Sequence, residues 1–242
     1  PGLHPAVVMI HGGGWRSGHK ASDKGMATYL STQGGITCFS INYRLAPQFK
    51  FPAQVLDCAR AVRWVRAHAA EYSVDPERLG ALGGSAGGHL SLMLGVMDPD
   101  AFQSPDDPNR ALSAKVQCVV STSGPTDLSG DTQWSDAAKL IAADFLGCTI
   151  ADDPAKYAQA SPLTYVTADD APTLMVHGDS DVLVPVEQSR AMKAALEKVG
   201  VATQLVEVAG GDHGFRGADP AAVAKAHQAM AQWLREHLKV GE

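Results

Sequence analysis

The stretch 79–90 constrains the fold of this chain more than any other. A short apolar run ends at Gly83, Ser85 follows at once, and an apolar helical pattern begins after Gly88. This order predicts a strand, a very sharp turn and a helix. Residues 83–87 fit the pattern Gly-x-Ser-x-Gly, in which glycines flank a serine on a strained, crowded turn. The pattern also arises by chance, so its meaning depends on the rest of the chain.

Six apolar runs alternate with helical patterns. Strands are expected over 5–10, 36–43, 79–83, 116–121, 172–176 and 202–208, and helices over 24–33, 52–68, 187–199, 220–238 and after Gly88. This alternation predicts an α/β fold with a mostly parallel sheet and helices on both faces. Clusters of glycine, histidine and aspartate follow the strands, at the sheet edge where open α/β sheets carry their active sites.

Composition narrows the class of protein. The chain has 242 residues, 45% of them hydrophobic and 19% charged, which is typical of a globular domain with a sizeable core. A net charge of −6 argues against a nucleic-acid partner and against a basic membrane-binding face. No apolar run approaches about 18 residues, so no transmembrane helix is expected. The cysteines are widely spaced and are expected to be free thiols, without zinc or a disulfide: Cys38, Cys58, Cys118 and Cys148.

Three segments break the regular alternation. Residues 73–77 are predicted to form a turn, and the Pro- and Asp-rich stretch 98–109 an exposed loop. Residues 125–165, at the carboxyl end of a strand that ends near 122, predict a small cap over a pocket, inserted in a single domain spanning 1–242. Aromatic residues in this segment are expected to shape an acyl or alcohol site: Trp134, Phe145 and Tyr157.

Ser85 needs a base before its hydroxyl can act as a nucleophile. Of the nine histidines, His213 is preferred, because it lies in a glycine-flanked loop after the last predicted strand. His11 and His177 close strands and are expected to brace loops, and His89 is expected to pack or to cap the helix after the serine.

The acid that orients the histidine is expected between the serine and the histidine in the chain. Asp181 follows the penultimate strand and is preferred. Asp179, on the same loop, and Asp127, after the preceding strand, remain alternatives. Asp212 adjoins His213 and is expected to point away from it.

Backbone amides are needed to stabilise the oxyanion of a tetrahedral intermediate. The amide of Ala86, directly after the serine, is one candidate. Three successive glycines follow the first strand, and of these we expect Gly13 and Gly14 to supply the others. Trp15 comes next and is expected to line the pocket as a substrate-binding residue, with a role as a core aromatic as the alternative.

Five motifs, in this order, carry a resemblance to a known family: His11-Gly12-Gly13-Gly14-Trp15, Asn42-Tyr43-Arg44-Leu45-Ala46-Pro47, Gly83-Gly84-Ser85-Ala86-Gly87-Gly88, His177-Gly178-Asp179-Ser180-Asp181-Val182-Leu183-Val184-Pro185 and Asp212-His213-Gly214. The chain resembles the α/β-hydrolase fold and, within it, the hormone-sensitive-lipase-like esterases and lipases. It is most similar to the feruloyl- or carbohydrate-esterase-like branch. The resemblance implies a triad and an oxyanion hole, without metal or organic cofactor, at Ser85, Asp181, His213, Gly13, Gly14 and Ala86.

The start of the sequence departs from this family. The strands that normally precede the glycine-loop strand are not in the sequence, nor is the N-terminal helical cap of many members. We therefore expect either a longer natural chain or a partner, with a homodimer left open, that covers the exposed sheet edge. The compartment cannot be read from a leader; the cytoplasm is favoured, and a removed signal peptide is left open.

The expected function is a serine carboxylesterase that forms an acyl-enzyme from a small-molecule ester. Short acyl groups are expected, on acetylated carbohydrates or as feruloyl esters, because the predicted cap has no long apolar amphipathic helix. An arylformamidase and a prolyl-oligopeptidase-like hydrolase are alternatives, although the latter usually carries a propeller domain. A non-catalytic small-ligand receptor on the same fold is a further alternative, and such receptors generally lose a triad residue.

Overall fold

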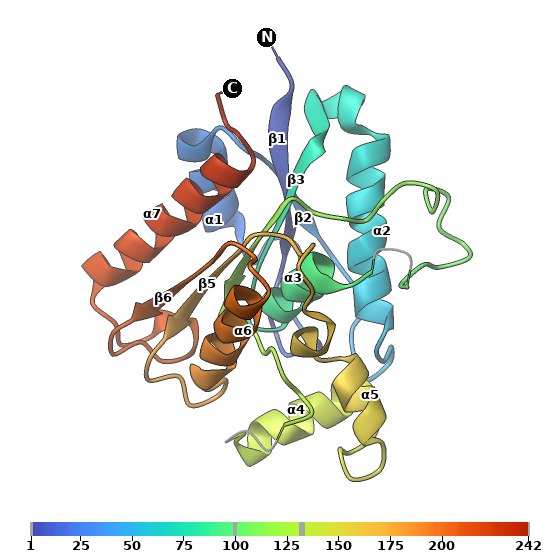
Figure 1. The fold of residues 1–242 in the computed structure, drawn as a ribbon, viewed down its shortest axis with the longest axis vertical. Helices are drawn as coiled ribbons and strands as arrows, with labels where there is room; N and C mark the ends of the chain where they lie inside the picture. The colour runs from blue at the N-terminus through green and yellow to red at the C-terminus, as the bar shows by residue number, and fades with distance from the viewer. Residues whose placement is uncertain (1, 99–100, 131–133, 242) are drawn as a thin grey trace.

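A computed structural model describes residues 2–98, 101–130 and 134–241 of the chain. In this part of the chain six strands form one parallel sheet in the order β2-β1-β3-β4-β5-β6 (Figure 1). Their bounds are β1 His4–Ile10, β2 Thr37–Ile41, β3 Val74–Gly84, β4 Cys118–Thr122, β5 Thr173–Gly178 and β6 Thr203–Val208. The parallel α/β architecture expected from the alternating pattern is confirmed.

Helices connect the strands. The α-helices are α1 Lys24–Tyr29, α2 Ala53–Ala67, α3 Ala86–Val96, α4 Asp136–Leu146, α5 Pro154–Gln159, α6 Glu187–Lys198 and α7 Pro220–His237. Shorter turns are the π-helical η1 Leu30–Gly34 and the 3-10 turns η2 Ala69–Tyr72, η3 Pro162–Tyr165 and η4 His213–Phe215. Within the described residues, no helix is long and apolar enough to cross a bilayer.

Two apolar layers sandwich the sheet, and β1 shows why. Ala6, Val8 and Ile10 face one core and Val7 and Met9 face the other, because successive side chains of a strand point to opposite faces. Helices α2, α3 and α6 cover the first face, and α1 and α7 cover the second (Figure 1). A strand buried on both sides therefore appears in the sequence as a continuous apolar run.

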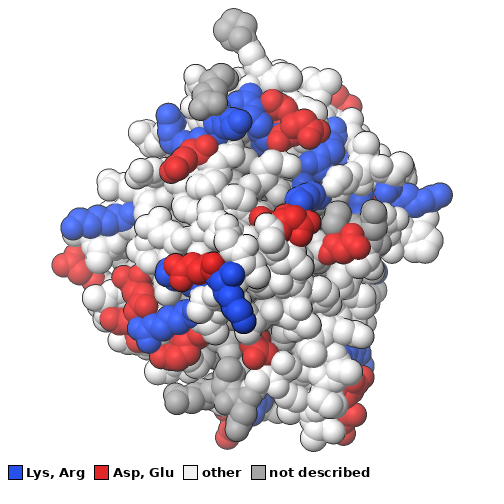
Figure 2. Space-filling model, viewed as in Figure 1, with Lys and Arg blue, Asp and Glu red and all other residues white. Residues whose placement is uncertain are grey.

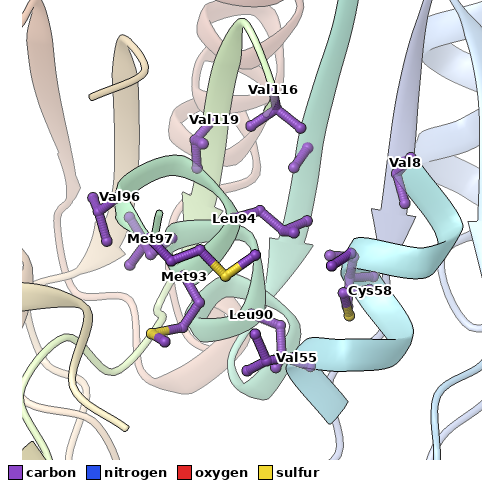
Figure 3. Close-up of a cluster of buried hydrophobic side chains, with 14 of the residues drawn as sticks. Val8, Val55, Cys58, Leu90, Met93, Leu94, Val96, Met97, Val116 and Val119 are labelled. Atoms are coloured by element: carbon purple, nitrogen blue, oxygen red, sulfur yellow. The ribbon is translucent and has the colours of Figure 1, made fainter. Parts of the chain in front are cut away.

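Helix α3 lies at the centre of the larger core. Leu90 and Met93 are fully buried, and Leu90 lies beside Val55 of α2 (Figure 3). All eleven residues of α3 are buried. The helix that follows Ser85 is therefore held rigidly against the sheet, which fixes the position of its first turn.

Two expected elements differ in their bounds. Residues 73–77 do not form only a turn: β3 begins at Val74, which pairs with His4, and the register then shifts before Ala6 meets Leu79. The helix expected over 24–33 is α-helical only to Tyr29 and ends as a π-helical turn. In that turn the Thr32 hydroxyl donates to the Thr28 carbonyl at 2.8 Å, a side-chain bond that competes with the helical pattern.

The stretch 98–109 is not exposed throughout. Asp107 is 1% exposed and accepts a hydrogen bond at 3.3 Å from Nη1 of Arg63, which is itself 1% exposed on α2. The expectation of an exposed loop is therefore wrong at this residue. A buried arginine needs a counter-charge, and the loop folds back to supply it.

The described residues of the segment 125–165 lie at the carboxyl ends of the strands. Helices α4 and α5 occupy this end of the molecule, at the bottom of Figure 1, and η3 follows them.

The face seen in Figure 2 carries acidic and basic residues side by side, without a large area of one charge sign. At the opposite edge of the sheet from β6, β2 has all five residues half-buried.

Candidate active site

Ser85 occupies a strained turn between β3 and α3. Its φ of +53° lies in the left-handed region, which costs a non-glycine residue about 1–3 kcal/mol and persists only where the surroundings enforce it. The flanking glycines are required by space. A Cβ at Gly87 would lie 1.9 Å from the Ile10 carbonyl oxygen, and one at Gly83 would lie 2.4 Å from the backbone of Gly87. The Gly-x-Ser-x-Gly pattern therefore reflects close approach of β1 to the turn.

Three side chains from three strand ends meet at this turn. His213, in η4 after β6, has its Nε2 2.9 Å from Ser85 Oγ. Its Nδ1 lies 2.7 Å from Oδ2 of Asp181, which follows β5. The residues expected to form a triad thus lie in one hydrogen-bonded line, although 128 positions separate Ser85 from His213.

Backbone and side-chain donors surround the Asp181 carboxylate. Its Oδ1 accepts the amides of Leu183 and Val184, both at 2.9 Å, in an Asx-turn. Burial raises the pKa of Asp181, but hydrogen bonds from the two imidazoles and the Val184 amide outweigh this and hold it well below its usual value. Asp181 is therefore ionised at neutral pH and can stabilise a protonated His213.

The other aspartates considered from the sequence are engaged elsewhere. Asp179 accepts the amide of Gly210 at 2.7 Å. Asp127 accepts the Ser129 hydroxyl at 2.7 Å and its amide at 2.8 Å. The carboxylate of Asp212 accepts a hydrogen bond from Arg216 at 3.0 Å.

His177 braces the Asp181 loop. It is fully buried, and its Nε2 donates to the Val184 carbonyl at 2.8 Å and lies 3.4 Å from Asp181 Oδ2. Its Nδ1 pairs with the hydroxyl of Ser189, on α6, at 2.7 Å. The expectation that His177 fixes a loop agrees with these contacts. Its contact with Asp181 was not anticipated, although the four-residue spacing was visible in the sequence.

Free backbone amides border the same space. Gly13 and Gly14 have φ values of +112° and +59°, and their amides donate to no acceptor within residues 2–98, 101–130 and 134–241. Ala86 is the first residue of α3, where helix geometry leaves amides without an internal partner. Donors arranged in this way can stabilise a negatively charged oxygen beside Ser85.

A cavity of about 620 Å³ opens over Ser85 and His213. The glycine loop borders one side, and apolar residues of the segment 125–165 border the other: Leu128, Trp134, Ala138, Ile141 and Ala142. Trp134 is therefore at the cavity wall, as expected. Phe145 is instead buried in the core, so the expectation that it shapes the site directly is wrong. Tyr157 lines a second cavity of about 690 Å³, which shares Leu128, Trp134, Ala138 and Ala142 with the first.

Trp15 borders the cavity but is only 3% exposed. Its ring is stacked on Phe145, and its Nε1 donates to Nδ1 of His89 at 3.3 Å. His89 is fully buried and its Nε2 donates to the Ala160 carbonyl at 2.7 Å. His89 therefore packs and anchors, as expected, and its neutral form has both ring nitrogens satisfied.

Burial lowers the pKa of His89 to about 4, and this makes stability depend on pH. In the unfolded chain the imidazole takes a proton near pH 6.5, whereas in the folded protein it stays neutral to about pH 4. The free energy of unfolding should therefore fall as the pH is lowered through this window, by up to about 3 kcal/mol. Urea unfolding at about pH 7 and about pH 4.5 measures it. His89→Gln should flatten the dependence; an equal loss in both proteins would contradict this assignment.

Comparison with known proteins assigns the family. The BD-FAE family model matches residues 2–196. The chain belongs to the BD-FAE family. This confirms the resemblance to α/β-hydrolase esterases inferred from the five motifs.

Relatives of this BD-FAE chain are esterases. The probable carboxylic ester hydrolase LipM of Mycobacterium tuberculosis is 34% identical over 82% of this chain and 46% of its own length. A truncated carbohydrate esterase from gut microbiota superposes with a TM-score of 0.87 at 28% identity, covering 99% of this chain and 87% of that one. A propionate-bound esterase of Thermogutta terrifontis has a TM-score of 0.81 at 30% identity, covering 97% and 84%. The chain spans about half the length of the curated relatives it matches.

Proposed function

We propose that this chain is a serine carboxylesterase. One observation carries the proposal: Ser85 Oγ lies 2.9 Å from His213 Nε2, whose Nδ1 lies 2.7 Å from Asp181 Oδ2. This is the hydrogen-bonded order of nucleophile, base and orienting acid that acyl transfer requires. The esterase relatives support the same reaction class.

In the acylation step Ser85 Oγ bonds to the ester carbonyl carbon while His213 Nε2 takes the hydroxyl proton. The π electrons of the carbonyl move to its oxygen, which the amides of Gly13, Gly14 and Ala86 stabilise. The carbonyl then re-forms, the carbon–oxygen bond to the alcohol breaks, and His213 delivers its proton to the departing alkoxide. Asp181 stabilises the imidazolium between these transfers.

Deacylation repeats these steps with water. His213 takes a proton from a water molecule as the water oxygen attacks the acyl carbon. The second tetrahedral oxyanion accepts hydrogen bonds from the same amides. Collapse breaks the bond to Ser85 Oγ, which recovers its proton from His213, and releases the carboxylic acid. Every step uses groups of the chain itself and of water.

The proposed substrates are esters of short acyl groups. We take the segment 125–165 as a cap inserted in a single domain of residues 1–242, and its side chains Leu128, Trp134 and Ile141 border the apolar side of the cavity. The propionate found in the Thermogutta esterase and the carbohydrate esterase from gut microbiota support short acyl groups on a carbohydrate alcohol. Feruloyl esters are the second substrate class.

A panel of p-nitrophenyl esters tests the proposal. We expect kcat/KM to be highest for acetate and butyrate and at least about 10-fold lower for octanoate, because each unaccommodated methylene forfeits on the order of 1 kcal/mol of transition-state binding. Acetylated xylose, methyl ferulate and N-formyl aryl amines complete the panel. Rising activity toward palmitate would contradict the short-chain assignment. Turnover of the formamides alone would favour an arylformamidase, and no turnover of any ester would favour a receptor.

A further inference from the structure

The loop that carries the free amides has an unusual backbone. Gly13, Gly14 and Trp15 follow one another with φ values of +112°, +59° and +57°. Glycine adopts this region freely, but tryptophan does not, and holding it there costs on the order of 1–2 kcal/mol. Such a conformation persists only where contacts from other elements impose it.

Those contacts reach Trp15 from three elements. Its indole is stacked on the Phe145 ring, with centroids 4.3 Å apart and planes 10° from parallel. Its Nε1 donates to His89 on α3, and its carbonyl accepts the Ala46 amide at 2.8 Å. The aromatic stack is the contact that α4 makes with the indole, and stacked aromatic pairs are stabilising beyond the area that they bury.

Helix α4 contacts three successive residues of the loop, Gly14, Trp15 and Arg16. Ile141 packs beside Gly14, where an added Cβ would lie 3.0 Å from its Cγ2. Phe145 meets Trp15, and Asp144 pairs with Arg16 at 2.6 Å. Residues spaced by three and four share one helix face, so a single face of α4 follows the loop. The Arg16–Asp144 pair is about 40% exposed and contributes little, since exposed ion pairs are worth about 0–1 kcal/mol.

Phe51 and His89 also hold Phe145 in place. Its carbonyl accepts the Phe51 amide at 2.9 Å, and its ring meets Phe51 and His89 edge-on, both with centroids 5.7 Å apart. The side chain is 0% exposed, and it is not a wall residue of the cavity. Phe145 can therefore hold the loop in a fixed position relative to the core without touching a substrate.

We propose that Phe145 is a positioning residue for the oxyanion loop: through its stack on Trp15 it holds the amides of Gly13 and Gly14 at the site of the developing negative charge. This inference rests on the esterase function proposed above. It assigns to α4 a role in transition-state stabilisation beyond closing the pocket. It also assigns to Trp15 the role of an anchor between the core and the loop.

The role predicts a specific kinetic signature. Amides that drift from the oxyanion position weaken transition-state binding, while the neutral ground-state ester loses little. A residue that only shapes the pocket would change KM instead. A residue that only stabilises the fold would change the melting temperature without lowering kcat of the folded protein.

The test compares three variants of the full chain. Phe145→Ala removes the stack, Phe145→Leu keeps most of the volume without the flat ring, and Leu140→Ala is the control, at a residue of the same helix that is 68% exposed. For each variant, kcat and KM are measured with p-nitrophenyl acetate. The inhibition constant of an aryl trifluoromethyl ketone is measured as well. Ser85 Oγ adds to the carbonyl carbon of this ketone while His213 takes the hydroxyl proton, and the carbonyl oxygen becomes a stable oxyanion.

We expect Phe145→Ala to lower kcat about 100-fold, which matches the loss of one oxyanion donor. The inhibition constant of the ketone should rise by a similar factor. KM should stay within about 3-fold of the wild-type value. Phe145→Leu should fall between this variant and the wild type, and Leu140→Ala should match the wild type. If Phe145→Ala does not fold, the Phe145→Leu comparison decides.

Three results would overturn the inference. Unchanged kcat and ketone affinity in folded Phe145 variants would do so, as would a rise in KM alone. An equal loss in Leu140→Ala would mean that the helix as a whole, rather than the stack, controls the loop. A wild-type chain without esterase activity overturns the proposed function together with this inference, whereas an active wild type with insensitive Phe145 variants overturns only the inference.

Discussion

Replacing Ser85 by alanine is expected to lower kcat/KM for p-nitrophenyl acetate by about 10⁴- to 10⁶-fold, the range seen when a triad nucleophile is removed. The hydroxyl is the only group that can form the acyl-enzyme in the proposed mechanism. The fold should be unaffected, because the turn is set by the close approach of Gly87 to Ile10 rather than by the hydroxyl. Steady-state kinetics and a melting curve measure the two effects.

Two further variants sharpen this experiment. His213→Ala should cost nearly as much as Ser85→Ala, and the double variant should lose little more, because nucleophile and base act as a unit. Ser31→Ala, at an exposed serine of η1, is the matched control and should keep full activity. Additive losses in the double variant would show that the two residues do not act in one step.

The second large effect concerns stability. Replacing Arg63 by methionine is expected to lower the free energy of unfolding by about 3–5 kcal/mol, because it leaves the Asp107 carboxylate buried without its counter-charge. Arg63 and Asp107 are each 1% exposed, and Arg63 Nε also donates to the Leu112 carbonyl at 3.0 Å. These bonds tie the stretch after α3 to α2.

Urea unfolding measures this loss against a matched surface pair. Arg190→Met breaks the pair with Glu207, in which the arginine side chain is 48% exposed, and should lower the free energy of unfolding far less than Arg63→Met. The double variant Arg63→Met with Asp107→Leu should recover part of the loss, since it removes both buried charges. Equal effects of Arg63→Met and Arg190→Met would mean that the buried pair contributes no more than an exposed one.

Much of the fold was predictable from local pattern. Strands buried on both faces, such as β1 and β5, appear as continuous apolar runs, and each ends at a glycine-containing motif. Chain order then predicted which serine, aspartate and histidine would meet, because parallel strands bring their carboxyl ends to one edge. The hydrogen bonds of His213 to Ser85 and Asp181 agree with that prediction.

What sequence could not predict depends on contacts between distant segments. Asp107 resembles a loop residue, and only its pairing with Arg63, 44 positions away, explains its burial. Phe145 was expected to shape the acyl or alcohol site because it lies in the predicted cap, but its ring packs against Trp15 and Phe51 instead. The early start of β3 depends on a register shift against β1, which no local pattern encodes.

Chemical labelling shows whether Ser85 is an activated nucleophile. The full chain is incubated with a fluorophosphonate, which loses fluoride when an activated serine oxygen attacks phosphorus, and is then analysed by intact and peptide mass spectrometry. We expect a single adduct per chain, located on Ser85, that forms far more slowly in His213→Ala. An unlabelled Ser85, or labelling that proceeds equally fast without His213, would contradict it.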